Sequence, residues 1–144
     1  MTDIVDAALI EELLLDLSRI PQMLFVLGGE GAVAEMFADG NEVTVTDGYA
    51  NVKAESWHIH IKLADISGTQ FVEAEDHGTP KLYYVRFSDI TEETLFRIYF
   101  PNPYMDERGN PIPFQPLRLV AFEEKRDKYV GRGGIVMAYV QRDP

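Results

Sequence analysis

The sequence of 144 residues contains 24 acidic and 13 basic residues, for a formal net charge of −11 at pH 7, and it has no cysteine. Its length is that of one domain, and 46% hydrophobic residues are enough for an ordinary folded core, so we expect residues 1–144 to form a single domain. The absence of cysteine excludes disulfides, thiolate metal sites and cysteine nucleophiles. The acidic balance argues against a nucleic-acid-binding protein and against adsorption to anionic lipid.

The chain carries no pattern typical of a targeting or membrane-spanning segment. Residues 1–6 are acidic rather than basic, unlike the start of a signal peptide. The longest apolar runs are far shorter than the roughly 20 residues that a helix needs to cross a bilayer. We therefore expect a cytoplasmic protein that does not insert into membranes.

The first predicted element is a helix over residues 3–20, in which apolar positions recur among acidic ones. Thr2 or Asp3 is expected as its N-cap, and the helix dipole stabilises the acidic residues of its N-terminal half. Pro21 stops the helix. We expect this helix to cover one face or one end of a sheet.

Residues 23–100 carry short β-type runs separated by turn signals, with no helical stretch between them. Asp39-Gly40 and Asp47-Gly48 are typical of hairpin turns, and Ser67-Gly68 is expected to break a strand. Consecutive strands with short turns predict a large antiparallel sheet, curved or folded over on itself. The expected strands are 23–27, 33–37, 42–46, 49–53, 57–63, 71–75, 81–87 and 95–100.

The C-terminal part begins with a proline-rich stretch over 101–113, expected to be a loop that acts as a lid or a spacer. Pro116 is typical of a first helical position, so a helix is predicted over 116–131, with basic residues near its end. A last strand over 135–140 is expected at a sheet edge. The predicted fold class is α+β, a large curved antiparallel sheet with an N-terminal and a C-terminal helix packed on it.

The stretch over 57–63 organises the functional prediction. As a strand it places Trp57, Ile59, Ile61 and Leu63 on one face, and His58, His60 and Lys62 on the other. The apolar face predicts a central position in a sheet. The two histidines then either form a ligand site or lie on a solvated polar face.

Three motifs resemble those of a known family. Gly48-Tyr49-Ala50-Asn51-Val52 is similar to that family's Gly-Tyr-Phe-Asn-Leu, and Trp57-His58-Ile59 to its Gly-His-Ile. Residues 84–87, an acidic turn and residues 95–100 are similar to its pair of strands ending in Leu-Lys-Ile-Phe. In this order and at similar spacing over about residues 43–100, they resemble the haem-utilisation family of the ChuX/HutX/HemS type. The resemblance implies long antiparallel strands with helices packed on them, and a haem site in the concavity of the sheet. It also implies a cytoplasmic role in haem storage, transfer or breakdown, often as a dimer.

Haem needs an axial ligand, an apolar slot and cations for its two propionates. Under the resemblance, the iron ligand is His58 or His60 through an imidazole nitrogen, or Tyr49 through a phenolate. The cations assigned to the propionates are Lys62, Arg86 and Arg97. The apolar slot is expected from Tyr83, Val85, Tyr99 and Phe114.

Other chemistries remain open at this stage. His58 and His60 can also be two ligands of a non-haem metal, because residues i and i+2 of a strand point the same way. Further ligands are missing, since Asp65 falls on the other face and His77 lies in a turn. No serine stands in a Gly-x-Ser-x-Gly context, so a hydrolase triad is not indicated.

The sequence favours a haem carrier over an enzyme, because no flavin or nicotinamide motif is visible that would supply reductant for haem breakdown. The partners expected for such a carrier are haem, a haem-accepting protein and a second copy of the chain in a homodimer. The alternative is an accessory or protein-interaction module on the same fold that does not hold haem.

Overall fold

The computed structural model describes residues 6–28, 31–38, 41–76 and 81–142. The predicted turn at 39–40 and the predicted N-caps at positions 2 and 3 lie outside these ranges. The elements are α1 (Ala7–Ser18), β1 (Met23–Gly28), β2 (Val33–Ala38), β3 (Glu42–Thr46), β4 (Tyr49–Lys53), β5 (His58–Lys62), a 3₁₀ turn η1 (Leu63–Asp65), β6 (Gly68–Asp76), β7 (Leu82–Ser88), β8 (Thr94–Tyr99), α2 (Pro116–Tyr129) and β9 (Val136–Arg142).

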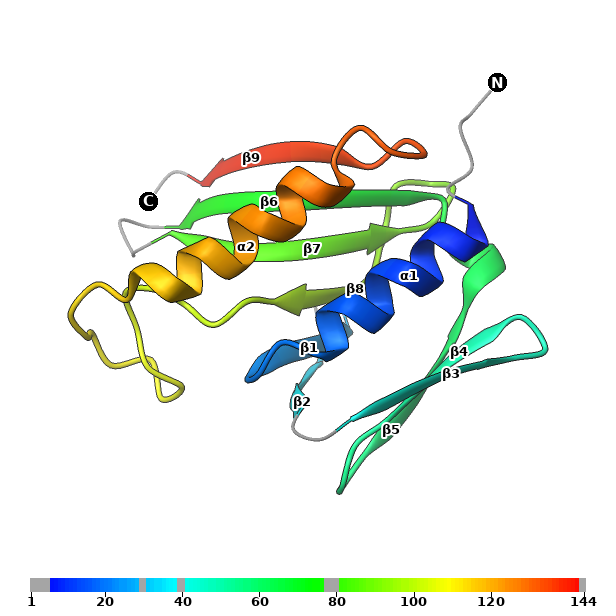
Figure 1. The fold of residues 1–144 in the computed structure, drawn as a ribbon, viewed down its shortest axis with the longest axis horizontal. Helices are drawn as coiled ribbons and strands as arrows, with labels where there is room; N and C mark the ends of the chain where they lie inside the picture. The colour runs from blue at the N-terminus through cyan, green and yellow to red at the C-terminus, as the bar shows by residue number, and fades with distance from the viewer. Residues whose placement is uncertain (1–5, 29–30, 39–40, 77–80, 143–144) are drawn as a thin grey trace.

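The strands form two sheets. One has the order β2-β1-β8-β7-β6-β9 and is antiparallel except where β9 runs parallel to β6, and the other has the order β3-β4-β5. Both helices lie on one face of the six-stranded sheet, and the three-stranded sheet projects beside α1 (Figure 1). The α+β class, with its large antiparallel-dominated sheet and a helix from each end of the chain, is confirmed.

Three details of the sequence prediction are wrong. The strand predicted over 57–63 is shorter, because the chain turns into η1 at Leu63, and β5 lies at the edge of its sheet rather than at the centre. Gly68 begins β6 instead of breaking a strand. The amide of Ser67 donates to the carbonyl of Ser88 at the end of β7, at 2.8 Å, so hydrogen bonding to β7 begins one residue before β6.

Helix α1 begins where Asp6 caps it, since the Asp6 carboxylate accepts from the amide of Ala8 at 2.9 Å. Among the described residues Asp6 therefore takes the capping role that the sequence prediction gave to Thr2 or Asp3. The helix buries one apolar stripe against the sheet and leaves its acidic residues outward. The buried residues of α1 are Leu9, Ile10, Leu13, Leu14 and Leu17.

One continuous core lies between the helices and both sheets. Phe122 of α2 packs on Tyr83 and Phe71, with ring centroids 5.0 and 5.9 Å apart. The core-facing residues of the three-stranded sheet belong to the same cluster; they are Ala50, Val52, Ile59 and Ile61. The other faces of both sheets therefore point away from this core. In Figure 1 the outer face of the six-stranded sheet is turned away from the viewer.

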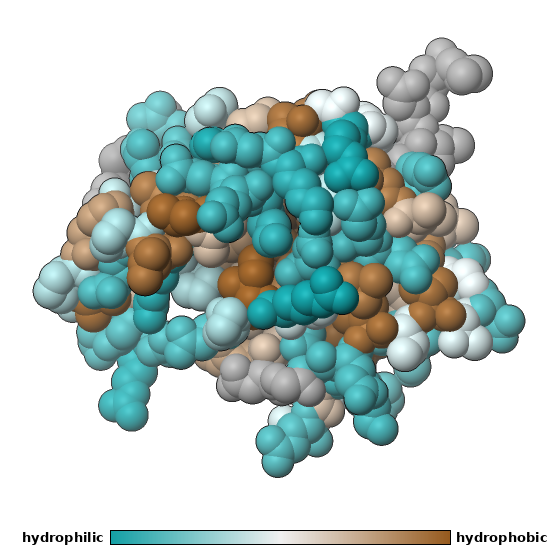
Figure 2. All heavy atoms as spheres, viewed as in Figure 1, coloured by the Kyte–Doolittle hydropathy of each residue, from teal (hydrophilic) through white to brown (hydrophobic). Residues whose placement is uncertain are grey.

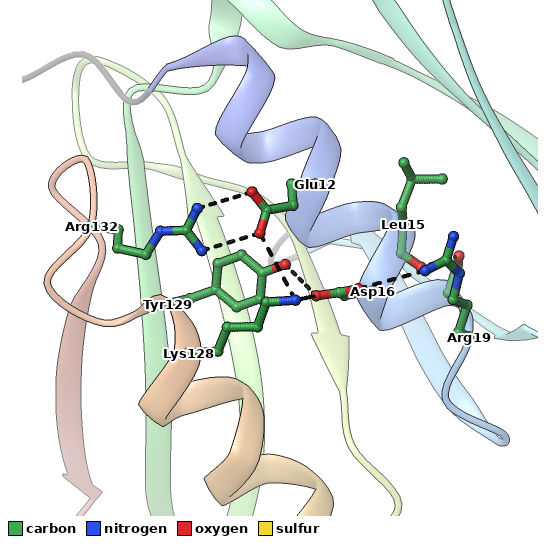
Figure 3. Close-up of polar contacts among 8 residues, drawn as sticks. Glu12, Leu15, Asp16, Arg19, Lys128, Tyr129 and Arg132 are labelled. Carbon is green, nitrogen blue, oxygen red and sulfur yellow. Dashed lines mark hydrogen bonds and ion pairs between the residues drawn. The ribbon is translucent and has the colours of Figure 1, made fainter.

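A polar network joins the two helices. Figure 3 shows Glu12 and Asp16 of α1 facing Lys128, Tyr129 and Arg132. The Arg132 guanidinium contacts both carboxylate oxygens of Glu12, at 2.9 and 3.1 Å, and the buried Tyr129 hydroxyl donates to Asp16. Burial opposes ionisation of Asp16, but hydrogen bonds from Lys128 and Tyr129 outweigh it and hold the pKa of this carboxyl below its usual value. This network fixes α1 against the end of α2.

The helix side of the molecule is mainly hydrophilic along α2, with hydrophobic groups exposed at several places between the hydrophilic ones (Figure 2). Phe114 and Leu117, at the start of α2, are 47% and 81% exposed. No helix among the described residues is long and apolar enough to cross a membrane.

Candidate functional site

The hairpin between β3 and β4 sets the register of the first candidate surface. Asp47 and Gly48 both have positive φ, 52° and 81°, the conformation of a two-residue type I′ turn. This turn places Thr46 opposite Tyr49 and Thr44 opposite Asn51. The Asp-Gly turn expected from the sequence is present and aligns alternate residues of β4 on the outer face.

We call the outer side of β4 and β5 the histidine face, made of Tyr49, Asn51, His58, His60 and Lys62. His58, His60 and Lys62 are exposed, whereas Ile59 and Ile61 between them are buried. Tyr49 lies opposite Lys62, and Asn51 lies opposite His60. Four of the six predicted haem-site residues, Tyr49, His58, His60 and Lys62, therefore share one surface.

Asn51 selects the tautomer of the neutral His60 imidazole. The side-chain oxygen of Asn51 lies 2.6 Å from Nδ1 of His60, and the Asn51 amide nitrogen donates to the carbonyl oxygen of Thr44 at 3.4 Å. Because the Asn51 oxygen can only accept, Nδ1 of His60 carries the hydrogen and Nε2 keeps its lone pair. The sequence analysis did not assign Asn51 a role, although its place in the Gly48–Val52 motif and the register of the hairpin point to it.

The two imidazole rings of the histidine face lie side by side. The ring centroids of His58 and His60 are 5.3 Å apart, with an interplanar angle of 66°. Lys53 lies opposite His58 on the neighbouring strand. The face thus offers two adjacent imidazole ligands flanked by the side chains of Lys53 and Lys62.

The other two candidates lie on the six-stranded sheet, on what we call the arginine face, the outer side of β7 and β8 around Arg86 and Arg97. These residues pair directly across the two strands. Arg86 donates to Thr94 Oγ1 at 2.6 Å, to Gln70 Oε1 at 2.9 Å and to the carbonyl of Glu92. The guanidinium of Arg86 is therefore held in place by neutral acceptors.

Arg97 has a different environment. Its guanidinium carbon lies 5.9 Å from the centroid of the Tyr84 ring, a cation–π contact. Within the part of the chain that the structure describes, no carboxylate forms an ion pair with this half-buried side chain. A guanidinium without a carboxylate partner beside an aromatic ring can receive an anionic group of a ligand.

An apolar cluster lies beside Arg97 on the arginine face. Tyr84 and Tyr99 pack with ring centroids 4.6 Å apart. The cluster consists of the buried residues Val72, Ala74 and Tyr84, and of the partly buried residues Leu82, Tyr99, Ala138 and Val140.

The apolar slot expected from the sequence is mostly wrong. Val85 is fully buried and Tyr83 is 4% exposed, and both belong to the core between sheet and helices. Phe114 packs on Tyr104 in the loop in a tilted arrangement, with 5.2 Å between ring centroids. Of the predicted set, Tyr99 alone belongs to the outer cluster, because alternation along β7 turns Tyr83 and Val85 inward and Tyr84 outward.

Trp57, just before β5, contacts β2 at the edge of the six-stranded sheet. The Trp57 indole donates to the carbonyl of Phe37 at 2.9 Å, which fixes the start of β5 against β2. On the outer side, Phe37 lies opposite Leu24, and Leu24 lies opposite Tyr99. A hollow of about 140 Å³ is lined by these three residues together with the start of the 101–113 loop. The loop therefore forms a wall of this hollow.

Arg118 of α2 holds that loop in place. It donates to the carbonyl oxygens of Asn102 and Met105, at 3.0 and 2.9 Å, and pairs with Glu107 at 3.2 Å. Asp106 accepts from the amides of Arg108 and Asn110, so the loop is a set of hydrogen-bonded turns.

Comparison with known proteins defines the class. A protein-family model matches residues 11–124 of the chain. Of solved structures, the chain resembles the haem-binding protein ChuX, with a TM-score of 0.69 and 12% identity over 86% of this chain and 74% of that one. It also resembles a protein from Agrobacterium tumefaciens, with a TM-score of 0.67 and 21% identity over 86% and 69% of the two chains. No curated protein matches the sequence significantly.

The same fold also occurs within longer chains. PhuS, a haem-binding protein from Pseudomonas aeruginosa, matches with a TM-score of 0.64 and 12% identity, and this chain covers 33% of its length. Identities this low show a shared fold. Because the family model matches most of the chain and the similar structures are of the ChuX type, the chain belongs to the haem-utilisation family of the ChuX/HutX/HemS type.

Proposed function

We propose that this protein binds haem on its outward sheet faces and acts as a cytoplasmic carrier in haem trafficking or storage. The observation that carries the proposal is the half-buried guanidinium of Arg97, which lies on Tyr84 at the border of an apolar cluster and has no carboxylate partner among the described residues. An apolar ligand that carries carboxylates satisfies both features at once. ChuX and PhuS, which share the fold, are named as haem-binding proteins.

The residues present fit the three requirements of haem. The imidazole of His60 has Nε2 available, because Asn51 holds the hydrogen on Nδ1. Tyr84, Tyr99 and their neighbours provide apolar surface, and Arg97 provides a cation for a propionate. When bound, haem would supply the iron centre, and the protein would supply the ligand, the apolar contact and the charge.

Each predicted residue then has a role that follows from its position. His60 is the preferred axial ligand, with His58 and the Tyr49 phenolate as neighbours on the same face. Arg97 contacts a propionate, and Arg86 adds positive charge from a fixed position on the same sheet. Lys62 offers a second cation beside the histidines. We propose these two faces as the binding surface.

Titration with hemin, followed by the Soret band, tests this assignment. We expect a sharp shift in the parent protein and its loss when both His58 and His60 are replaced by alanine, whereas His77→Ala serves as the histidine control. Arg97→Gln should weaken binding by about 10- to 100-fold, because a hydrogen bond to a charged group contributes about 1.5–3 kcal/mol. Arg126→Gln, on the helix side, is the matched arginine control. Hemin binding unchanged in all these variants would refute the proposed site.

A carrier and a haem-degrading enzyme differ in the fate of the haem. The haem-loaded protein with ascorbate and oxygen should keep its Soret band, and it should pass haem to an apo-globin acceptor. Progressive bleaching would instead indicate breakdown. Sedimentation with and without hemin tests the proposed homodimer.

The second candidate is an accessory module that acts through protein contacts. The exposed side chains of Phe114 and Leu117 on the helix side favour it. Absence of any Soret shift, together with a partner contact that is lost in Leu117→Ser, would support this reading over haem binding.

A further inference from the structure

We propose that His58 and His60 form a chelating site for a bare divalent transition-metal ion of the Zn²⁺, Ni²⁺ or Cu²⁺ class, with Asn51 as the residue that orients His60. This inference concerns an ion without a porphyrin, so it does not depend on haem binding. It uses the same imidazoles, and the two ligands therefore exclude each other at this face.

The spacing of the two rings matches bidentate chelation. Nitrogen ligands lie about 2.0–2.1 Å from zinc, and two imidazoles on one ion at a near-tetrahedral angle have ring centroids about 5 Å apart. The centroids of His58 and His60 are 5.3 Å apart. The two rings therefore lie near the separation that one shared ion requires.

The hydrogen bonds around His60 are those of a metal-binding imidazole. A metal-ligating histidine donates its other ring N–H to an oxygen acceptor, which fixes the tautomer and the direction of the ring. Here the acceptor is the Asn51 oxygen, 2.6 Å from Nδ1, and the carbonyl of Thr44 in turn accepts from the Asn51 amide. Nε2 of His60 is thereby left as a ligand with a defined direction.

The surroundings decide which ions suit the site and how tightly they bind. Both imidazoles are exposed, so water can fill the remaining coordination positions. The described part of the chain holds no group of three or more histidine, aspartate or glutamate side chains that could enclose a metal. Imidazole without carboxylate favours Zn²⁺, Ni²⁺ and Cu²⁺ over Mg²⁺ and Ca²⁺. The charges of Lys53 and Lys62 oppose the cation, so we expect modest affinity.

Calorimetric titration of the untagged protein with ZnCl₂ and NiCl₂ tests the site, because a polyhistidine tag would bind the same ions. We expect one ion per chain in the parent, and at least a 10-fold loss of affinity in His58→Ala and in His60→Ala. Asn51→Leu should weaken binding by about 10-fold or more, and Asn51→Asp, which still accepts from His60, should retain it. His77→Ala is the matched control and should bind as the parent does.

Several results would overturn the inference: stoichiometry near zero, equal affinity in the double histidine variant, loss of binding in His77→Ala, or displacement of Zn²⁺ by equimolar Mg²⁺. Titrating the zinc-loaded protein with hemin separates this site from the proposed haem site. If Zn²⁺ binds through His58 and His60 but hemin binding is absent or indifferent to Zn²⁺, the haem assignment fails and the metal site stands. If hemin binds and Zn²⁺ does not, the metal site fails and the haem assignment stands.

Discussion

Replacing Tyr129 by phenylalanine removes one buried hydroxyl from the contact between the two helices. The Tyr129 side chain is fully buried, its ring stacks on Phe71, and its hydroxyl donates to Asp16 of α1 (Figure 3). Desolvation and the hydrogen bond to the Asp16 carboxylate both raise the pKa of the Tyr129 phenol, so it is a donor at neutral pH. The substitution keeps the ring and deletes only this donor.

The expected loss of stability follows from the partners of Asp16. A hydrogen bond to a charged group contributes about 1.5–3 kcal/mol. The Asp16 side chain is 13% exposed and keeps the Lys128 ammonium at 2.5 Å, so it is not left without a partner. We therefore expect the lower half of that range, about 1.5–2 kcal/mol, which corresponds to a fall in Tm of roughly 5–7 °C for a domain of this size.

Urea denaturation followed by circular dichroism measures this change, with Asp16→Asn and the double variant completing a mutant cycle. We expect a coupling energy of about 1 kcal/mol or more, because the two groups are in direct contact. Tyr139→Phe, on the exposed side of edge strand β9, is the matched control and should change stability little. A Tyr129→Phe protein as stable as the parent, or additive single variants, would refute the role assigned to this contact.

Two further predictions concern the same structure. Folding lowers the pKa of Asp16 and that of Asp89, where hydrogen bonding from Thr91 is the main cause, so the folded state binds fewer protons than the unfolded state. The stability that these two carboxylates contribute is therefore complete above about pH 4–5 and falls as the pH drops through the folded pKa values. Asp16→Asn should reduce this loss in urea titrations at a series of pH values. Trp57→Phe removes the hydrogen bond to the Phe37 carbonyl and should lower the free energy of unfolding by about 1–2 kcal/mol. Circular dichroism is the measurement, because Trp57 is the chain's one tryptophan and the variant has no tryptophan fluorescence. Unchanged stability would show that the junction of β5 and β2 does not depend on the indole.

Local pattern was sufficient for most elements. The period-2 alternation of 57–63 correctly separates Ile59 and Ile61 from His58 and His60, because side chains alternate on any strand whatever its partners are. The Asp-Gly pair gave the turn at 47–48, because positive φ is required at both positions. Pro116 correctly marked the first turn of α2.

Pairings between distant residues could not be predicted, because they depend on how whole elements pack. The sequence shows that Tyr83 and Val85 share a face opposite to that of Tyr84, but the position of the helices decides which face is buried. The contact between Asn51 and His60 depends on the register of β4 and β5.

By itself, then, the sequence determined the α+β class, the run of antiparallel strands, the outward direction of the histidines and the resemblance to the haem-utilisation family. Tertiary structure decided that β9 pairs in parallel with β6, that β5 is an edge strand, and that Arg97 lies on Tyr84 beside Tyr99. The physical reason is the distance along the sequence over which each effect acts. Alternation and turn chemistry act over two to four residues, whereas a binding surface is assembled from strands that meet only when the core between sheets and helices has formed.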